Sequence, residues 1–210
     1  MNDYQDEQLR GLNAVLKYLN AMSDDQRDDL RAALVDYLDF RRRTKRFLSQ
    51  HFGHLCNVKC YQNRLSACCS KDGIITFFAD VVINTLLSDE QELADLFRVL
   101  KARQTGFKCV YLAESGCLWR LKPIVCEMFL CDAAQQEVFS REPACEKAWC
   151  HLLEEKKSFT WPDRPVLFDA LEQAFIDQGC NSSLMYLHKS PGLLMVKKKI
   201  REKGNVNHER

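Results

Sequence analysis

Residues 109–131 read CVYLAESGCLWRLKPIVCEMFLC and hold four of the eleven cysteines of the chain. The same stretch contains an ESG turn sequence at residues 114–116 and a proline, Pro123, of the kind that often occupies the first turn of a helix. A second group of four cysteines lies upstream, at Cys56, Cys60, Cys68 and Cys69. We expect the two groups to meet in space around a metal ion or an iron–sulfur centre.

Length and composition are those of a folded, soluble protein. The chain has 210 residues, enough for a substantial core, and 46% of them are hydrophobic. No apolar run approaches the ~18 residues that a membrane-spanning helix needs. The N-terminus is acidic and polar, whereas a secretory signal is basic and then apolar. These features predict a cytoplasmic protein with no membrane partner, and in that reducing compartment clustered cysteines more often bind metal than form disulfides.

The charges are balanced overall but unevenly distributed. The formal net charge is +1, yet residues 1–40 carry nine acidic and four basic side chains, and residues 41–46 read RRRTKR. Basic tracts of this kind can bind nucleic acid, but they more often form a solvated helix face. The overall neutrality argues against a protein dedicated to nucleic-acid binding, which would show a broad basic surface.

Four leucines predict a helix near the N-terminus. Within residues 5–22 they recur at three- and four-residue steps, which places them on one face of a helix. Ser23 and Gln26 then form the pattern of a capping box, so a second helix is expected to begin there. We therefore expect a helical hairpin over residues 1–50. Its apolar face would either dock a protein partner or pack on the chain's own core.

Residues 51–188 are expected to form a cysteine-cluster metal-binding domain, followed by a basic tail over residues 189–210. Residues 51–70 lack periodicity and predict a loop, with a turn at residues 71–73. The expected strands are residues 74–78, 108–112 and 117–121, of which the last two form a hairpin. Further helices are expected from the Ser88–Gln91 capping box to near Gly106, over residues 124–130, and after Pro143 and Pro165. The fold class is thus mostly α with a small β-hairpin or short sheet, an α+β cysteine-cluster metal-binding fold.

Cysteine thiolates are soft anionic ligands, which select zinc, copper(I) or iron–sulfur clusters over magnesium and calcium. Four of them complete a tetrahedral zinc site or hold one cubane cluster. The short gap between Cys56 and Cys60 returns the chain to the same centre. Cys68 and Cys69 are adjacent, and adjacent side chains of an extended segment point to opposite faces. The pair therefore fits a multi-iron cluster, or two nearby sites, better than a single zinc ion.

Two pieces of the sequence match a known pattern. Residues 109–112 match the form C-x-[FY]-L, and residues 117–126 with Phe129 match C-x-I-Y-x-x-R-P-x-x-C-R-x-F with its first x absent. The departures are Leu118, Trp119, Lys122 and Glu127. The upstream cysteines follow C-x3-C-x7-CC, a widened form of a CxxCxxCC signature. On these residues the chain resembles the family of CxxCxxCC cysteine-cluster domains, described as zinc- or iron-chelating, over residues 56–131.

The resemblance implies metal or iron–sulfur binding, with a [4Fe-4S] cluster or zinc as the cofactor. The ligands that it implies are Cys56, Cys60, Cys68, Cys69, Cys109, Cys117 and Cys126. Cys131 joins this set by its proximity to the others. Cys145 and Cys150 are open candidates, and Cys180 is most simply a buried thiol.

Lys122 stands where the family pattern has arginine. A cubane held by four thiolates is anionic, so a nearby cation would stabilise it and raise its reduction potential. The alternative for Lys122 is an ordinary surface lysine before a helix. His51, His54 and His151 lie near cysteines in the sequence and are further candidates for zinc ligands, although exposed loop histidines are common.

Three classes of function follow from these features. The first is a metal-binding protein whose centre is structural or transfers electrons. The second is an enzyme, either an oxidoreductase or a methyltransferase-like protein, because a flagellin lysine methylase carries a similar cysteine cluster. Against an enzyme, the chain has only eight glycines and no Gly-rich cofactor loop after a strand. The third is a protein-interaction module that the metal holds together and that docks through its N-terminal helices.

Overall fold

The N-terminal helices form where the leucine spacing and the capping box predict them. The computed structural model describes residues 3–63, 65, 68–70, 75–102, 106–161, 166–190, 192 and 195. Its first three helices are α1 (Asp3–Ala21), α2 (Asp24–Ala33) and α3 (Val35–His51). Ser23 caps α2, because its Oγ accepts a hydrogen bond from the Gln26 N–H at 3.2 Å while the Gln26 side chain accepts from the Ser23 N–H at 3.0 Å. The predicted capping box is therefore confirmed.

The chain stays helical beyond α3 as far as Tyr61, in the first part of the loop predicted over residues 51–70. The short helix α4 (Gly53–Leu55) and the π-helix η1 (Cys56–Tyr61) follow with little interruption. Phe52 joins them, since its N–H donates to Leu48 O at 2.9 Å and its carbonyl accepts from the Cys56 N–H at 2.8 Å. The loop prediction was wrong here because these turns are short and largely exposed, so they carry no apolar stripe. We call α3, α4 and η1 together the helical arm.

A strand was predicted at residues 74–78, and its described part, residues 75–78, is not a strand but leads into a helix. Helix α5 (Phe78–Leu87) begins there and is buried from Phe78 to Leu86. The Asp80 side chain accepts a hydrogen bond from the Phe77 N–H at 3.1 Å, which fixes the start of the helix. So short an apolar run does not distinguish a strand from the start of a buried helix by its period, which explains the error.

Helix α6 (Glu90–Lys101) begins one residue later than its predicted capping box. Asp89 is the N-cap, and its Oδ1 accepts a hydrogen bond from the Glu92 N–H at 2.8 Å. Ser88 and Gln91 have the same spacing as Asp89 and Glu92, but the acidic pair forms the capping box. The helix ends at Lys101, earlier than the predicted end near Gly106.

The predicted hairpin is present but shorter than expected. Strand β1 (Leu112–Ala113) pairs antiparallel with β2 (Gly116–Cys117), with Leu112 opposite Cys117 and Ala113 opposite Gly116. Gly116 has a φ of 114°, a conformation that other residues rarely adopt, so the turn requires glycine there. An isolated antiparallel bridge pairs Ser70 with Lys108. Ser70, just after Cys69, therefore lies beside the chain that leads into the hairpin.

Further helices follow the hairpin along the described chain. They are α7 (Ile124–Glu127), α8 (Asp132–Phe139), α9 (Pro143–Thr160), α10 (Leu167–Ile176) and α11 (Tyr186–Lys189). The helix predicted at residues 124–130 is confirmed in a shorter form, and Pro143 does begin a helix. The turn predicted at residues 71–73, Pro165 and nearly all of the basic tail lie outside the described residues.

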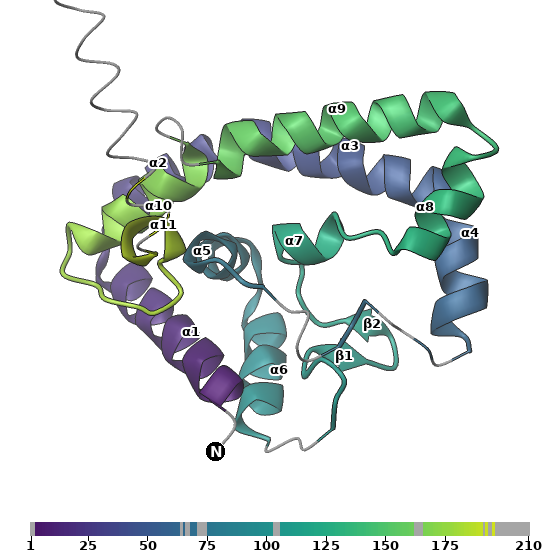
Figure 1. Ribbon diagram of the computed structural model, residues 1–210. Coiled ribbons are helices and arrows are strands. Elements are labelled where there is room, and N and C mark those ends of the chain that lie inside the picture. Colours follow the sequence, from purple (N-terminus) through teal and green to yellow (C-terminus); the bar gives the residue numbers. More distant parts are fainter. Residues whose placement is uncertain are drawn as a thin grey trace, which may run out of the picture.

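Helix α5 is at the centre of the core (Figure 1). It contacts both α1 and α10. Helix α1 also contacts α6, and helix α10 also contacts α9 and α11. We call α1, α5, α6, α10 and α11 the packed half. Leu12, Val15 and Leu19 of α1 belong to the same buried cluster as α5 and α10, so the apolar face of α1 packs on the chain's own core.

The helical arm runs away from the packed half. Figure 1 shows α3 alongside α9, with α4 at the far end and the hairpin and α7 between the arm and α6. The protein is thus mostly helical with one two-stranded antiparallel hairpin, as the sequence predicted. None of the described helices combines the length and the apolar character needed to cross a membrane.

Candidate metal centre

Eight cysteines line one cavity of about 520 Å³ between the helical arm, the hairpin, α7 and α8. They are Cys56, Cys60, Cys68, Cys69, Cys109, Cys117, Cys126 and Cys131. These are the eight residues that the sequence proposed as metal ligands, and the fold brings all of them together. The other three cysteines, Cys145, Cys150 and Cys180, are not among the residues that line this cavity.

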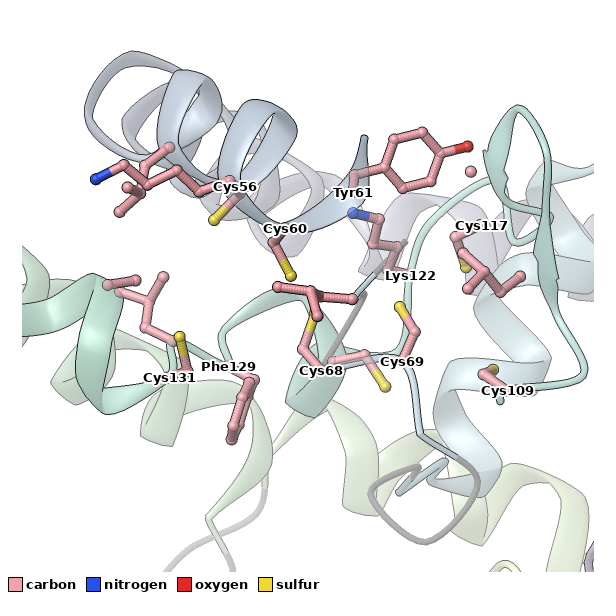
Figure 2. A pocket seen from close by; sticks show the side chains of 18 of the residues that line it. Cys56, Cys60, Tyr61, Cys68, Cys69, Cys109, Cys117, Lys122, Phe129 and Cys131 are labelled. Atoms are coloured by element: carbon pink, nitrogen blue, oxygen red, sulfur yellow. The ribbon is translucent and has the colours of Figure 1, made fainter. Parts of the chain in front are cut away.

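The wall formed by the arm carries Cys56 and Cys60 on η1. They are four residues apart, about one helical turn, so both can face the cavity (Figure 2). Lys59 Nζ lies 2.8 Å from both carboxylate oxygens of Glu137, which ties η1 to α8. The Tyr61 hydroxyl donates to the carbonyl of Glu114 and ties the end of η1 to the hairpin turn.

The opposite wall is built on the hairpin. The Cys109 N–H donates to the Cys69 carbonyl at 2.9 Å, which holds these two cysteines next to each other along the backbone. Cys117 follows on β2. Tyr111 and Trp119 are buried, line the cavity and pack edge to face with ring centroids 5.1 Å apart. The hairpin is therefore supported by aromatic packing beneath its cysteines.

Two buried polar residues of α5 hold the segment that leads from the hairpin to α7. Asn84 Nδ2 donates to Leu121 O at 2.6 Å, and Asn84 Oδ1 accepts from the Leu121 N–H at 2.9 Å. Asp80 Oδ1 accepts from the Ile124 N–H at 3.0 Å. These bonds fix the backbone on both sides of Lys122 and set the start of α7, which carries Cys126.

Arg41 of the arm reaches the same segment. It is 3% exposed, and its guanidinium donates to Lys122 O at 2.6 Å and to the Tyr37 hydroxyl at 2.7 Å. It also lies 3.6 Å from Glu127 Oε2 in α7. Burial raises the pKa of the neighbouring Asp80 to about 7, although Arg41 and two backbone N–H groups act in the opposite direction. A buried cation thus joins the arm, α7 and the cavity wall.

Most of the cavity thiols are protonated at neutral pH when nothing is bound. Burial raises the pKa of Cys109 to about 12 and that of Cys126 to about 11, and it also raises the pKa of Cys56 and of Cys117. A bound metal ion would have to displace these protons, because the thiolate is the ligand.

Cys68 and Cys69 behave as a pair. The Cys68 thiol donates a hydrogen bond to the Cys69 sulfur, which raises the pKa of Cys68 and lowers the pKa of Cys69. The ammonium group of Lys122 lies nearby (Figure 2) and favours the thiolate form of both residues. Cys69 is therefore the thiol of this pair that ionises first.

A second group of ligand-type side chains lies outside the cavity. His51, Glu142 and Cys145 have their ligand atoms within 4.8 Å of one another, and His51 Nδ1 lies 3.1 Å from Glu142 Oε2. The sequence marked His51 and Cys145 separately but missed Glu142, since 91 residues separate it from His51 and no local pattern links them. His54 and His151 are exposed.

Comparisons of the chain with protein-family models, with curated proteins and with solved structures found no match. The similarity to the CxxCxxCC domains therefore depends on the residues quoted above, and membership of that family stays a prediction. The convergence of eight thiols on one cavity is independent of any relative and is the main feature of this site.

Proposed function

We propose that this chain is a metal-binding protein whose cavity cysteines hold an iron–sulfur cluster, with electron transfer as its role. The observation that supports the proposal is that eight of the eleven cysteines, from segments far apart in the sequence, line a single cavity. Buried free cysteines are common singly, but eight thiols around one cavity have no packing explanation. Thiolates are the ligands that iron–sulfur clusters and zinc require.

The size of the cavity favours a cluster over one zinc ion. A zinc ion uses four thiolates at about 2.3 Å and leaves no space between them. This cavity offers eight thiols around about 520 Å³, which inorganic sulfide and iron would fill. Apolar groups such as Leu55, Leu130 and Trp119 also line it, and such a shell around a centre controls solvent access and reduction potential.

Lys122 is the residue that we assign to tuning the centre. Its ammonium group interacts with the thiols of Cys56, Cys68, Cys69 and Cys117. Lys59 also lines the cavity, but it pairs with Glu137 and so its charge is already compensated. A cation beside an anionic cluster stabilises the reduced form, so Lys122→Gln should lower the reduction potential while Lys59→Gln should change it less.

The deciding experiment is anaerobic purification followed by metal and sulfide analysis, with a visible absorption spectrum before and after reduction. The proposal predicts iron and acid-labile sulfide in comparable amounts, and absorption that dithionite bleaches and an oxidant restores. A colourless protein with stoichiometric zinc would assign the cavity to a structural zinc site instead. A protein that contains neither metal, even without oxygen, would contradict metal binding altogether.

A further inference from the structure

The eight cavity cysteines divide into two groups of four, by their position in Figure 2 and, for Cys126, by its interactions with Cys109 and Cys117. Figure 2 shows Cys56, Cys60 and Cys131 toward one end of the cavity and Cys109 and Cys117 toward the other, with Cys68 and Cys69 between them. The arm quartet is Cys56, Cys60, Cys68 and Cys131. The hairpin quartet is Cys69, Cys109, Cys117 and Cys126.

The backbone supports each quartet separately. In the arm quartet, Cys56 and Cys60 share η1, and η1 is tied to α8, which Cys131 caps, through the Lys59–Glu137 ion pair. In the hairpin quartet, the backbone of Cys69 is hydrogen-bonded to that of Cys109. The two supports rest on different elements, and the hydrogen bond from Tyr61 to Glu114 joins them.

Most of the electrostatic interactions between thiols follow the same division, and Cys126 also interacts with Cys68 across it. Cys56 interacts electrostatically with the other three members of the arm quartet. Cys109 interacts with Cys117 and Cys126, and Cys69 interacts with Cys109 and Cys117, which connects the whole hairpin quartet. The two quartets also touch, because the Cys68 thiol donates to the Cys69 sulfur.

We propose that the cavity holds two metal centres side by side, one in each quartet, joined through the peptide bond between Cys68 and Cys69. This inference rests on the proposed function and adds the number of centres and the ligands of each. Four thiolates complete one tetrahedral zinc site or hold one cubane cluster, so eight thiols fill two centres with none left over. Lys122 serves both centres, because its ammonium group interacts with two thiols of each quartet.

The test is the metal content of the anaerobically purified chain when one quartet at a time is disabled. One variant carries Cys56→Ser with Cys131→Ser, and another carries Cys117→Ser with Cys126→Ser. Each should keep half of the wild-type metal per chain, because a centre that loses two of four ligands no longer holds its metal while the other quartet stays intact. Cys150→Ser changes an exposed cysteine of α9 outside the cavity and should keep the full metal content.

Complete loss of metal from either double variant, with helix content retained by circular dichroism, would overturn the two-centre arrangement but not metal binding by the cavity. Unchanged metal in either variant would overturn the ligand assignment. A wild-type chain without metal would overturn both this inference and the proposed function. Where a double variant does not fold, the wild-type stoichiometry decides, because two zinc ions or the iron of two clusters per chain supports the inference and half of either overturns it.

Discussion

In the packed half, α5 is buried from Phe78 to Leu86, whereas around the cysteine cavity Leu65 and Phe129 are 59% and 53% exposed. The two regions are therefore held by different interactions. Apolar burial stabilises the packed half, since each buried large side chain contributes about 1.5–3 kcal/mol. The cavity walls combine buried side chains such as Tyr111 and Trp119 with hydrogen bonds and ion pairs from α5, α8 and the arm, and most of their cysteines face a space. The fold should thus form without metal, while the cavity needs its occupant to become rigid.

The largest expected effect comes from the packed half. Phe168 is fully buried and packs edge to face against Tyr37 and Phe77, so Phe168→Ala should cost about 3–5 kcal/mol in the free energy of unfolding. Phe129→Ala in the exposed rim of the cavity should cost no more than about 0.5 kcal/mol. Denaturant unfolding of both variants measures the contrast. Equal losses would mean that the cavity wall is part of the core.

Removal of the metal should loosen the region around the cysteine cavity and leave the packed half unchanged. Once metal is chelated, amide hydrogen exchange should accelerate in residues 53–61 and 106–131 and stay slow in α5 and α10. Bound metal stabilises the folded state by about 2.7 kcal/mol when the free metal concentration is 100 times its dissociation constant. Loss of that free energy corresponds to roughly a hundredfold faster exchange. Exchange measured by mass spectrometry with and without metal tests this. Acceleration throughout α5 and α10 would show that the metal holds the whole fold.

The tethers from α5 to the cavity should have intermediate effects. Asn84→Ala removes both hydrogen bonds to Leu121 and leaves its backbone groups without these partners, so it should cost about 1–3 kcal/mol and also weaken metal retention. Thr85→Ala is the matched control, since Thr85 is buried on the same helix but bonds to Val81 O within it. Unfolding midpoints and metal content per chain are the measurements. Equal metal loss in the two variants would argue against a tether.

The last expected effect is a dependence on pH through Asp80. Its pKa is raised by burial from 3.8 to about 7, so the stability it contributes is fully present below pH ~3.8 and is lost as the pH rises through about 7. Asp80→Asn cannot titrate, so the stability of the wild-type chain relative to that variant should decrease between pH 5 and 8. Thermal unfolding of both metal-free proteins across that range measures the difference. A constant or increasing difference would mean that Asp80 is ionised throughout.

Local patterns predicted the parts of the fold that depend on neighbouring residues. The Ser23–Gln26 capping box and the helix after Pro143 follow from sequence and are present. The hairpin turn is also present, although its strands are shorter than predicted. The strand predicted at residues 74–78 was wrong for the described residues 75–78, because so short an apolar run before a buried helix has no period that separates a strand from a helix.

The candidate site also has a part that the sequence predicts and a part that it does not. Cysteine spacing and the family resemblance picked out the eight residues that line the cavity, because ligands of one centre must be close and of one chemical type. The residues that position them were not predictable. Arg41 reaches Lys122 across 81 positions and Asn84 reaches Leu121 across 37, and nothing in the local sequence marks either contact.

The most direct test of the central claim is alkylation of the native, anaerobically purified protein, mapped cysteine by cysteine by mass spectrometry. Cys56, Cys68 and Cys131 of the cavity and Cys150 outside it are all exposed, so Cys150 is a matched control within the same molecule. The account predicts that Cys150 reacts while the three cavity cysteines are protected, and that chelation increases the alkylation rate of each cavity cysteine while leaving that of Cys150 unchanged. Equal reactivity of the four before chelation would contradict the claim that these thiols converge to hold a metal.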